Sequence, residues 1–192
     1  MDNSSTKQTL RNYGLQLEKP EETAYVLGGL GSLPAMVFQE NGQWDDFIPV
    51  YEPQFNDKFD SYGCTVWGNL NALEFLIHRL QGAERNFSER FTYILAGVKP
   101  PGADPHKVLE VIRKKGVIDE KLLPMTDDWD EFNSPNPMTK DLLEKGLEFP
   151  YEVQHEYIKW GSKEERIKRM KDTLRYSPLG ISVTAWIKKD GL

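Results

Sequence analysis

The longest regular pattern of apolar residues in this chain begins shortly after residue 63. Apolar residues recur there at intervals of four, three, four and three positions, which places their side chains on one face of an α-helix: Val66, Leu70, Leu73, Ile77 and Leu80. Asp60 and Ser61 precede the pattern as candidate caps, and Gly82 follows it as a stop. The pattern therefore predicts a helix with one buried face.

Two shorter helices are predicted next, each with residues suited to its ends. Ser88 is placed to cap the first of them and Gly97 to terminate it. In the second, Asp104 is the expected cap, Pro105 occupies the first helical position, and Gly116 ends the helix. Three helices are thus expected between residues 64 and 116.

The second half of the chain mixes helical and strand-like patterns. A polar, proline-rich connection at 127–139 leads into a short predicted helix at 139–146, and residues 151–160 have strand-like character. A Ser-x-x-Glu capping box at 162–165 predicts a further helix to about residue 176. Residues 180–187 alternate apolar and polar side chains, so we expect a strand with one buried face.

That last predicted strand has no later partner in the sequence. An unpaired strand leaves an open sheet edge, so we expect another chain or a further C-terminal segment to complete the sheet. The expected organisation is an N-terminal extension (1–45), a helical subdomain that carries the cysteine (46–126), and an incomplete β-containing subdomain (127–192).

Composition excludes several classes of function. With 30 acidic and 24 basic residues the chain has a net charge of −6, which disfavours binding to nucleic acid. Neither a signal peptide nor a membrane-spanning segment is evident, so a cytoplasmic location is the default expectation. One cysteine and three scattered histidines give no zinc spacing, and the motif TDDWDE (126–131) is interpreted as a solvated acidic turn. We therefore predict no metal and no cofactor.

The single cysteine, Cys64, lies where the longest predicted helix begins. Unpaired backbone N–H groups at a helix N-terminus favour an anion, so the pKa of this thiol is expected to fall. A lone cysteine is more often a buried, inert side chain, and that interpretation stays open. The surroundings nevertheless favour a nucleophile: Gln54 lies ten residues earlier as a donor for an oxyanion, and Gly63 leaves room beside the sulfur.

The stretch PQFNDKFDSYGCTVW (53–67) resembles the papain-like cysteine peptidases, which place an oxyanion-hole glutamine before a catalytic cysteine at the start of a central helix. Residues 86–91, 102–124 and 176–186 are similar, in the same order, to further segments of that family. The resemblance spans roughly residues 46–188. It implies an α+β, papain-like fold with a helical left subdomain and the first part of a barrel-like β right subdomain.

The chain also departs from the family pattern. The usual Cys-Gly-Ser-Cys-Trp core is here replaced by Tyr-Gly-Cys-Thr-Val-Trp at 62–67, so the disulfide partner is missing and Thr65 stands where tryptophan is expected. The spacing between Gln54 and Cys64 is longer than usual. These differences suggest a distant member from a reducing environment.

The resemblance implies hydrolysis of peptide or protein substrates, with Cys64 as nucleophile and Gln54 in the oxyanion hole. The family's catalytic His and Asn would fall ~130–150 residues after the cysteine, beyond Leu192, so we expect the 192-residue chain alone to be inactive. His78 would lie ~21 Å along the helix from the sulfur, while His106 is expected to be an exposed residue near a helix cap and His155 a surface or partner-facing side chain. The alternatives are an inactive papain-fold module that binds peptides or has a structural role, and a cysteine amidase or acyltransferase.

Overall fold

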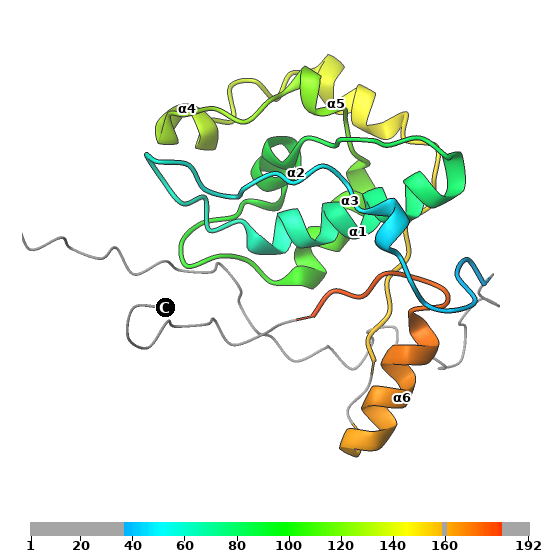
Figure 1. Ribbon diagram of the computed structural model, residues 1–192. Helices are drawn as coiled ribbons and strands as arrows, with labels where there is room; N and C mark the ends of the chain where they lie inside the picture. Colours follow the sequence, from blue (N-terminus) through cyan, green and yellow to red (C-terminus); the bar gives the residue numbers. More distant parts are fainter. Residues whose placement is uncertain (1–36, 159–160, 182–192) are drawn as a thin grey trace, which may run out of the picture.

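The computed structural model describes residues 37–158 and 161–181, and its regular structure there consists of helices joined by loops (Figure 1). Short 3₁₀ helices occupy Asp45–Phe47 (η1) and Glu120–Leu122 (η2). The α-helices of the described ranges are α1 (Cys64–Gln81), α2 (Glu89–Ala96), α3 (Pro105–Lys115), α4 (Trp129–Asn133), α5 (Lys140–Leu147) and α6 (Lys163–Thr173).

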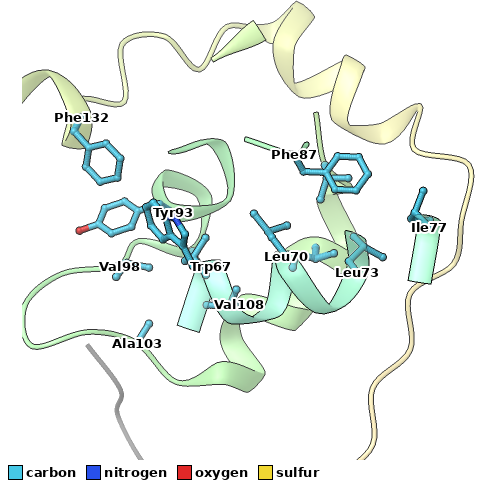
Figure 2. Packing of buried hydrophobic residues seen from close by; sticks show 14 residues of the cluster. Trp67, Leu70, Leu73, Ile77, Phe87, Tyr93, Val98, Ala103, Val108 and Phe132 are labelled. Carbon is cyan, nitrogen blue, oxygen red and sulfur yellow. The ribbon is translucent and has the colours of Figure 1, made fainter. Parts of the chain in front are cut away.

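The long helix α1 runs through the middle of the structure with α2 and α3 packed against it (Figures 1 and 2). Its expected apolar face is confirmed except at its end, where Leu80 is 45% exposed. Gly82 adopts a left-handed conformation with φ of 67°, and its N–H bonds to the His78 carbonyl. Glycine adopts this conformation without a steric penalty, so the predicted stop of the helix is confirmed.

The capping residues of α2 and α3 are also as predicted. The Ser88 hydroxyl accepts a hydrogen bond from the Phe91 N–H at 3.1 Å, and the Asp104 carboxylate accepts one from the His106 N–H at 3.1 Å. Helix α3 ends at Gly116, where φ is 69° and a β-carbon would overlap the Gly146 carbonyl oxygen. The chain thus needs glycine at 116 because α3 ends against the backbone of α5.

Helices α5 and α6 begin at their predicted caps. Thr139 caps α5, and Ser162 and Glu165 form the expected capping box of α6. Helix α6 ends at Thr173, three residues before the predicted end. It lies apart from the other helices (Figure 1). The Trp44 indole N–H, which donates to the Leu174 carbonyl at 2.6 Å, joins the end of α6 to the start of the described chain.

The predicted α+β fold class, with part of a β barrel, is wrong for the described residues. They contain no strand or sheet, only isolated antiparallel bridges such as Phe55 with Asp60 and Phe87 with Asp119. Residues 151–158 form no strand, and among them Tyr157 takes part in an isolated bridge. The predicted strand at 180–187 lies outside the described residues from position 182 onward, and with it the predicted open sheet edge.

Candidate active site

Cys64 is the first residue of α1, as predicted, and its thiol is half-buried. The residue before it, Gly63, is the N-cap, and its N–H donates to the Ser61 hydroxyl at 3.2 Å. A β-carbon at position 63 would overlap the indole ring of Trp67 and come within 2.9 Å of the Ser61 hydroxyl. The space that glycine provides is therefore taken by Trp67, one turn along the helix.

The loop that leads to Cys64 folds back on itself. The Asn56 side-chain oxygen accepts hydrogen bonds from the backbone N–H groups of Lys58 and Phe59, each at 2.9 Å, and so closes a tight turn. The Gln54 carbonyl accepts a hydrogen bond from the Ser61 N–H at 3.1 Å. The turn therefore accommodates the long spacing between Gln54 and Cys64. It brings the backbone of Gln54 into hydrogen-bond contact with Ser61, which lies three residues before Cys64. The role of the Gln54 amide in binding an oxyanion stays a prediction.

Tyr62, two residues before the thiol, has an unusual backbone conformation. Its φ is 58°, a left-handed value that non-glycine residues seldom adopt, and no other non-glycine residue of the described part has a positive φ. The Asp60 carboxylate accepts a hydrogen bond from the Tyr62 N–H at 2.9 Å. The Tyr62 ring meets the Trp129 ring edge-on, with centroids 6.3 Å apart. Such conformations gather at functional sites, where the surrounding structure holds them in place.

The pKa of the Cys64 thiol is raised, whereas its position at a helix N-terminus predicted a lowered pKa. Burial is the main cause that raises the pKa of Cys64, and the negative charge of Asp60 raises it further. The Thr65 backbone N–H lowers the pKa, as expected for a helix N-terminus, but its effect is smaller than that of burial. The free thiol is therefore held in its protonated form at neutral pH, and a nearby base would be needed to ionise it.

The three histidines lie elsewhere in the described structure. His78 packs edge-on against Phe47, with ring centroids 5.4 Å apart, fourteen residues along α1 from Cys64. His106 and His155 are half-buried rather than exposed, and their Nδ1 and Nε2 atoms are 2.8 Å apart. Burial and the neighbouring His106 lower the pKa of His155. Within the described residues, no hydrogen bond or ring contact joins a histidine to Cys64.

Comparison with known proteins does not place this chain in a family. No protein-family model matches it, and neither a curated protein nor a solved structure matches it. The site therefore has to be interpreted from its own geometry.

A group of buried carboxylates was not foreseen from the sequence. Glu74 in α1 and Glu89 in α2 are each only 3% exposed, and Glu52 and Glu120 are close enough to influence them electrostatically. Burial is the main cause that raises the pKa of Glu74 to about 7 and that of Glu89 to about 9. The Glu74 carboxylate accepts a hydrogen bond from the Phe87 N–H at 2.8 Å. Since Glu74 lies ten residues along α1 from the thiol, ~15 Å at 1.5 Å per residue, this group belongs to the core rather than to the site.

The acidic motif at 126–131 is organised around α4. Asp128 caps this helix by accepting a hydrogen bond from the Glu131 N–H at 2.7 Å, and Glu131 pairs with Arg90 at 3.5 Å. Among the described residues, no group of three or more histidine, cysteine, aspartate or glutamate side chains is arranged to hold a metal ion. The same residues include no helix that is both long enough and apolar enough to cross a membrane.

Proposed function

We propose that this chain carries the nucleophile of a papain-like cysteine peptidase, with Cys64 as the attacking residue. The observation on which the proposal rests is the position of Cys64, the first residue of an 18-residue helix that forms the centre of the core. A nucleophile mounted on such a helix is held rigidly while its sulfur remains half-exposed. The folded-back loop adds support, because the Gln54 carbonyl accepts a hydrogen bond from the N–H of Ser61, three residues before the thiol, and so keeps the backbone of Gln54 near Cys64.

In the proposed reaction, a base takes the proton from the Cys64 thiol, and the sulfur attacks the carbonyl carbon of the scissile peptide bond. The negative charge that develops on the carbonyl oxygen is stabilised by the Cys64 backbone N–H and the Gln54 side-chain amide. The C–N bond then breaks, the amine leaves with a proton from the protonated base, and water hydrolyses the thioester. A histidine is the expected base, and it would be one that the described residues do not place beside Cys64.

A second candidate is a catalytically inactive module that binds peptides. The raised pKa of Cys64 favours this alternative, because a protonated thiol is a poor nucleophile. The engagement of His106 with His155 favours it as well, since neither imidazole is available to Cys64 in this arrangement. The two candidates differ in one respect that can be measured, which is whether Cys64 forms a covalent acyl intermediate.

Hydrolysis of a fluorogenic peptide amide tests the proposal. Because the part of the chain that the structure describes places no base beside the thiol, we expect negligible turnover by the 192-residue chain. Added imidazole should raise the rate about tenfold, a small part of the ~10²–10⁴-fold that a positioned acid–base group supplies. The increase should vanish in Cys64→Ala and fall in Gln54→Ala, whereas Gln43→Ala, an exposed glutamine on another loop, should keep it. Peptide binding without any imidazole-dependent hydrolysis would favour the inactive module instead.

A further inference from the structure

Three aromatic residues near the candidate nucleophile, Phe59, Tyr62 and Trp129, are partly exposed, and Phe59 and Trp129 also pack against the core. The Trp129 ring meets Phe59 edge-on with centroids 5.3 Å apart and meets Tyr62 at 6.3 Å. Tyr62 precedes Cys64 by two residues, which places this end of the aromatic group near the thiol. We call these three residues, Phe59, Tyr62 and Trp129, the aromatic face.

The aromatic face is held rigidly from both sides. Tyr62 is fixed at φ 58° by the hydrogen bond from its N–H to the Asp60 carboxylate. Trp129 opens α4, and the side chain of Arg90, only 4% exposed, donates hydrogen bonds to the carbonyls of Phe132 and Glu131 in that helix. A buried guanidinium bound to backbone carbonyls keeps α4 in position. The aromatic face is therefore organised before any ligand arrives.

The surroundings of the aromatic face are strongly negative. The two segments that form it, 54–64 and 125–133, contain six carboxylates and one lysine. That lysine, Lys58, pairs with Asp127 at 3.6 Å, and Arg90, from α2, pairs with Glu131 at 3.5 Å, which leaves four of the six carboxylates without a salt-bridge partner among the described residues. Asp57, Asp128 and Asp130, in the same two segments, are exposed. An anionic side chain would be repelled here, whereas a cation would be attracted both by the carboxylates and by the electron-rich faces of the rings.

Resting on the proposed function, we propose that the aromatic face selects peptide substrates with a lysine or arginine side chain next to the scissile bond. The long methylene stem of either side chain can lie along the rings while its charged end reaches the carboxylates. An uncharged apolar side chain would gain the ring contact but no electrostatic attraction. Charge complementarity therefore favours a basic side chain over an uncharged apolar one at this surface.

The rate at which peptidyl chloromethyl ketones alkylate Cys64 tests this preference. We would compare tripeptide reagents that carry Lys, Leu or Glu at each position in turn, with each rate divided by the rate for iodoacetamide. At low ionic strength the lysine reagent should react at least about tenfold faster than the glutamate reagent at one position, and added salt should reduce the ratio. Equal ratios at every position, or fastest reaction of the leucine reagent, would overturn the proposal.

Two variants locate the effect. Tyr62→Gly removes a ring but suits the backbone, because glycine adopts φ 58° without strain, so thermal stability should be retained or raised. Its Lys/Glu ratio should fall at least threefold. Asp130→Lys should lower the ratio at least as much, whereas the matched control Asp46→Lys, on the exposed side of η1, should leave it unchanged. An unaltered ratio in both Tyr62→Gly and Asp130→Lys would refute the assignment of the site.

Alkylation needs only an accessible thiol, so this preference can be measured whether or not the chain hydrolyses peptides. If hydrolysis fails but the Lys/Glu ratio holds, the aromatic face is a cation-binding surface and the peptidase proposal alone is lost. If hydrolysis succeeds with no preference for basic side chains, the peptidase proposal stands and the aromatic face is not its specificity site.

Discussion

Replacement of Glu74 by glutamine should change how the stability of the protein depends on pH. In the folded state, burial raises the pKa of Glu74 from 4.5 to about 7, so the side chain keeps its proton where the unfolded chain would lose it. A raised folded pKa contributes stability below pH 4.5, and this contribution is lost as pH rises through 7. Each pKa unit corresponds to ~1.4 kcal/mol, so the full loss is about 3 kcal/mol.

Glutamine cannot ionise, and its side-chain oxygen can still accept the hydrogen bond from the Phe87 N–H. The added amide N–H₂ brings a cost that does not depend on pH. We therefore consider the difference in free energy of unfolding between Glu74→Gln and wild type. This difference should rise by about 2.5 kcal/mol between pH 5 and pH 8, whether the variant is more or less stable than wild type at pH 5.

Urea unfolding followed by tryptophan fluorescence at several pH values measures this difference. The matched control is Glu144→Gln, which removes an exposed carboxylate in α5 that pairs with Lys140 at 3.3 Å. Exposed pairs contribute little, so the control should show a change of only a few tenths of a kcal/mol over the same range. If the difference between Glu74→Gln and wild type stays constant from pH 5 to pH 8, the account of a buried, protonated Glu74 is wrong.

Two further predictions concern other parts of the chain. Gly116→Ala should destabilise the fold by at least ~3 kcal/mol, because φ is 69° and a β-carbon would overlap the backbone of α5. The control Gly68→Ala, at an open site in α1, should instead stabilise the fold by roughly 1 kcal/mol. Similar changes in the free energy of unfolding for the two variants, measured by urea unfolding, would contradict this prediction. Asp60→Asn should speed alkylation of Cys64 by iodoacetamide at pH 7, since loss of the negative charge lowers the thiol pKa, and an unchanged pH–rate profile would count against that role.

The helices could be predicted from sequence because their signals are local. Ser88, Asp104 and Ser162 cap helices through hydrogen bonds to backbone groups only two or three residues away, so their identity and position were sufficient. Helix α4 was not predicted, because it has only five residues and lies within a polar, proline-rich stretch. The strand predicted at 151–160 was wrong over the described residues, because strand formation depends on pairing with a segment distant in the sequence, which a local pattern does not report.

The site was predicted less fully than the fold around it. The position of Cys64 at a helix N-terminus follows from the apolar periodicity, but the direction of its pKa shift depends on burial, which comes from tertiary packing. The pairing of His106 with His155 joins residues 49 positions apart and left no local signal. Glu74 could have been found, because it lies four residues after Leu70 and three before Ile77, on the apolar face of α1.

The central claim is that Cys64 is an acyl-forming nucleophile, and mass spectrometry of the chain after it reacts with a peptidyl p-nitrophenyl ester tests it most directly. This leaving group departs without needing a proton, so the reaction can proceed even without a positioned acid. The account predicts one acyl group per chain, attached to Cys64, formed faster in the folded protein than in the urea-unfolded chain at the same fraction of thiolate. Acylation no faster than that of the unfolded chain would contradict the claim, because it would show that the fold gives no assistance to the thiol.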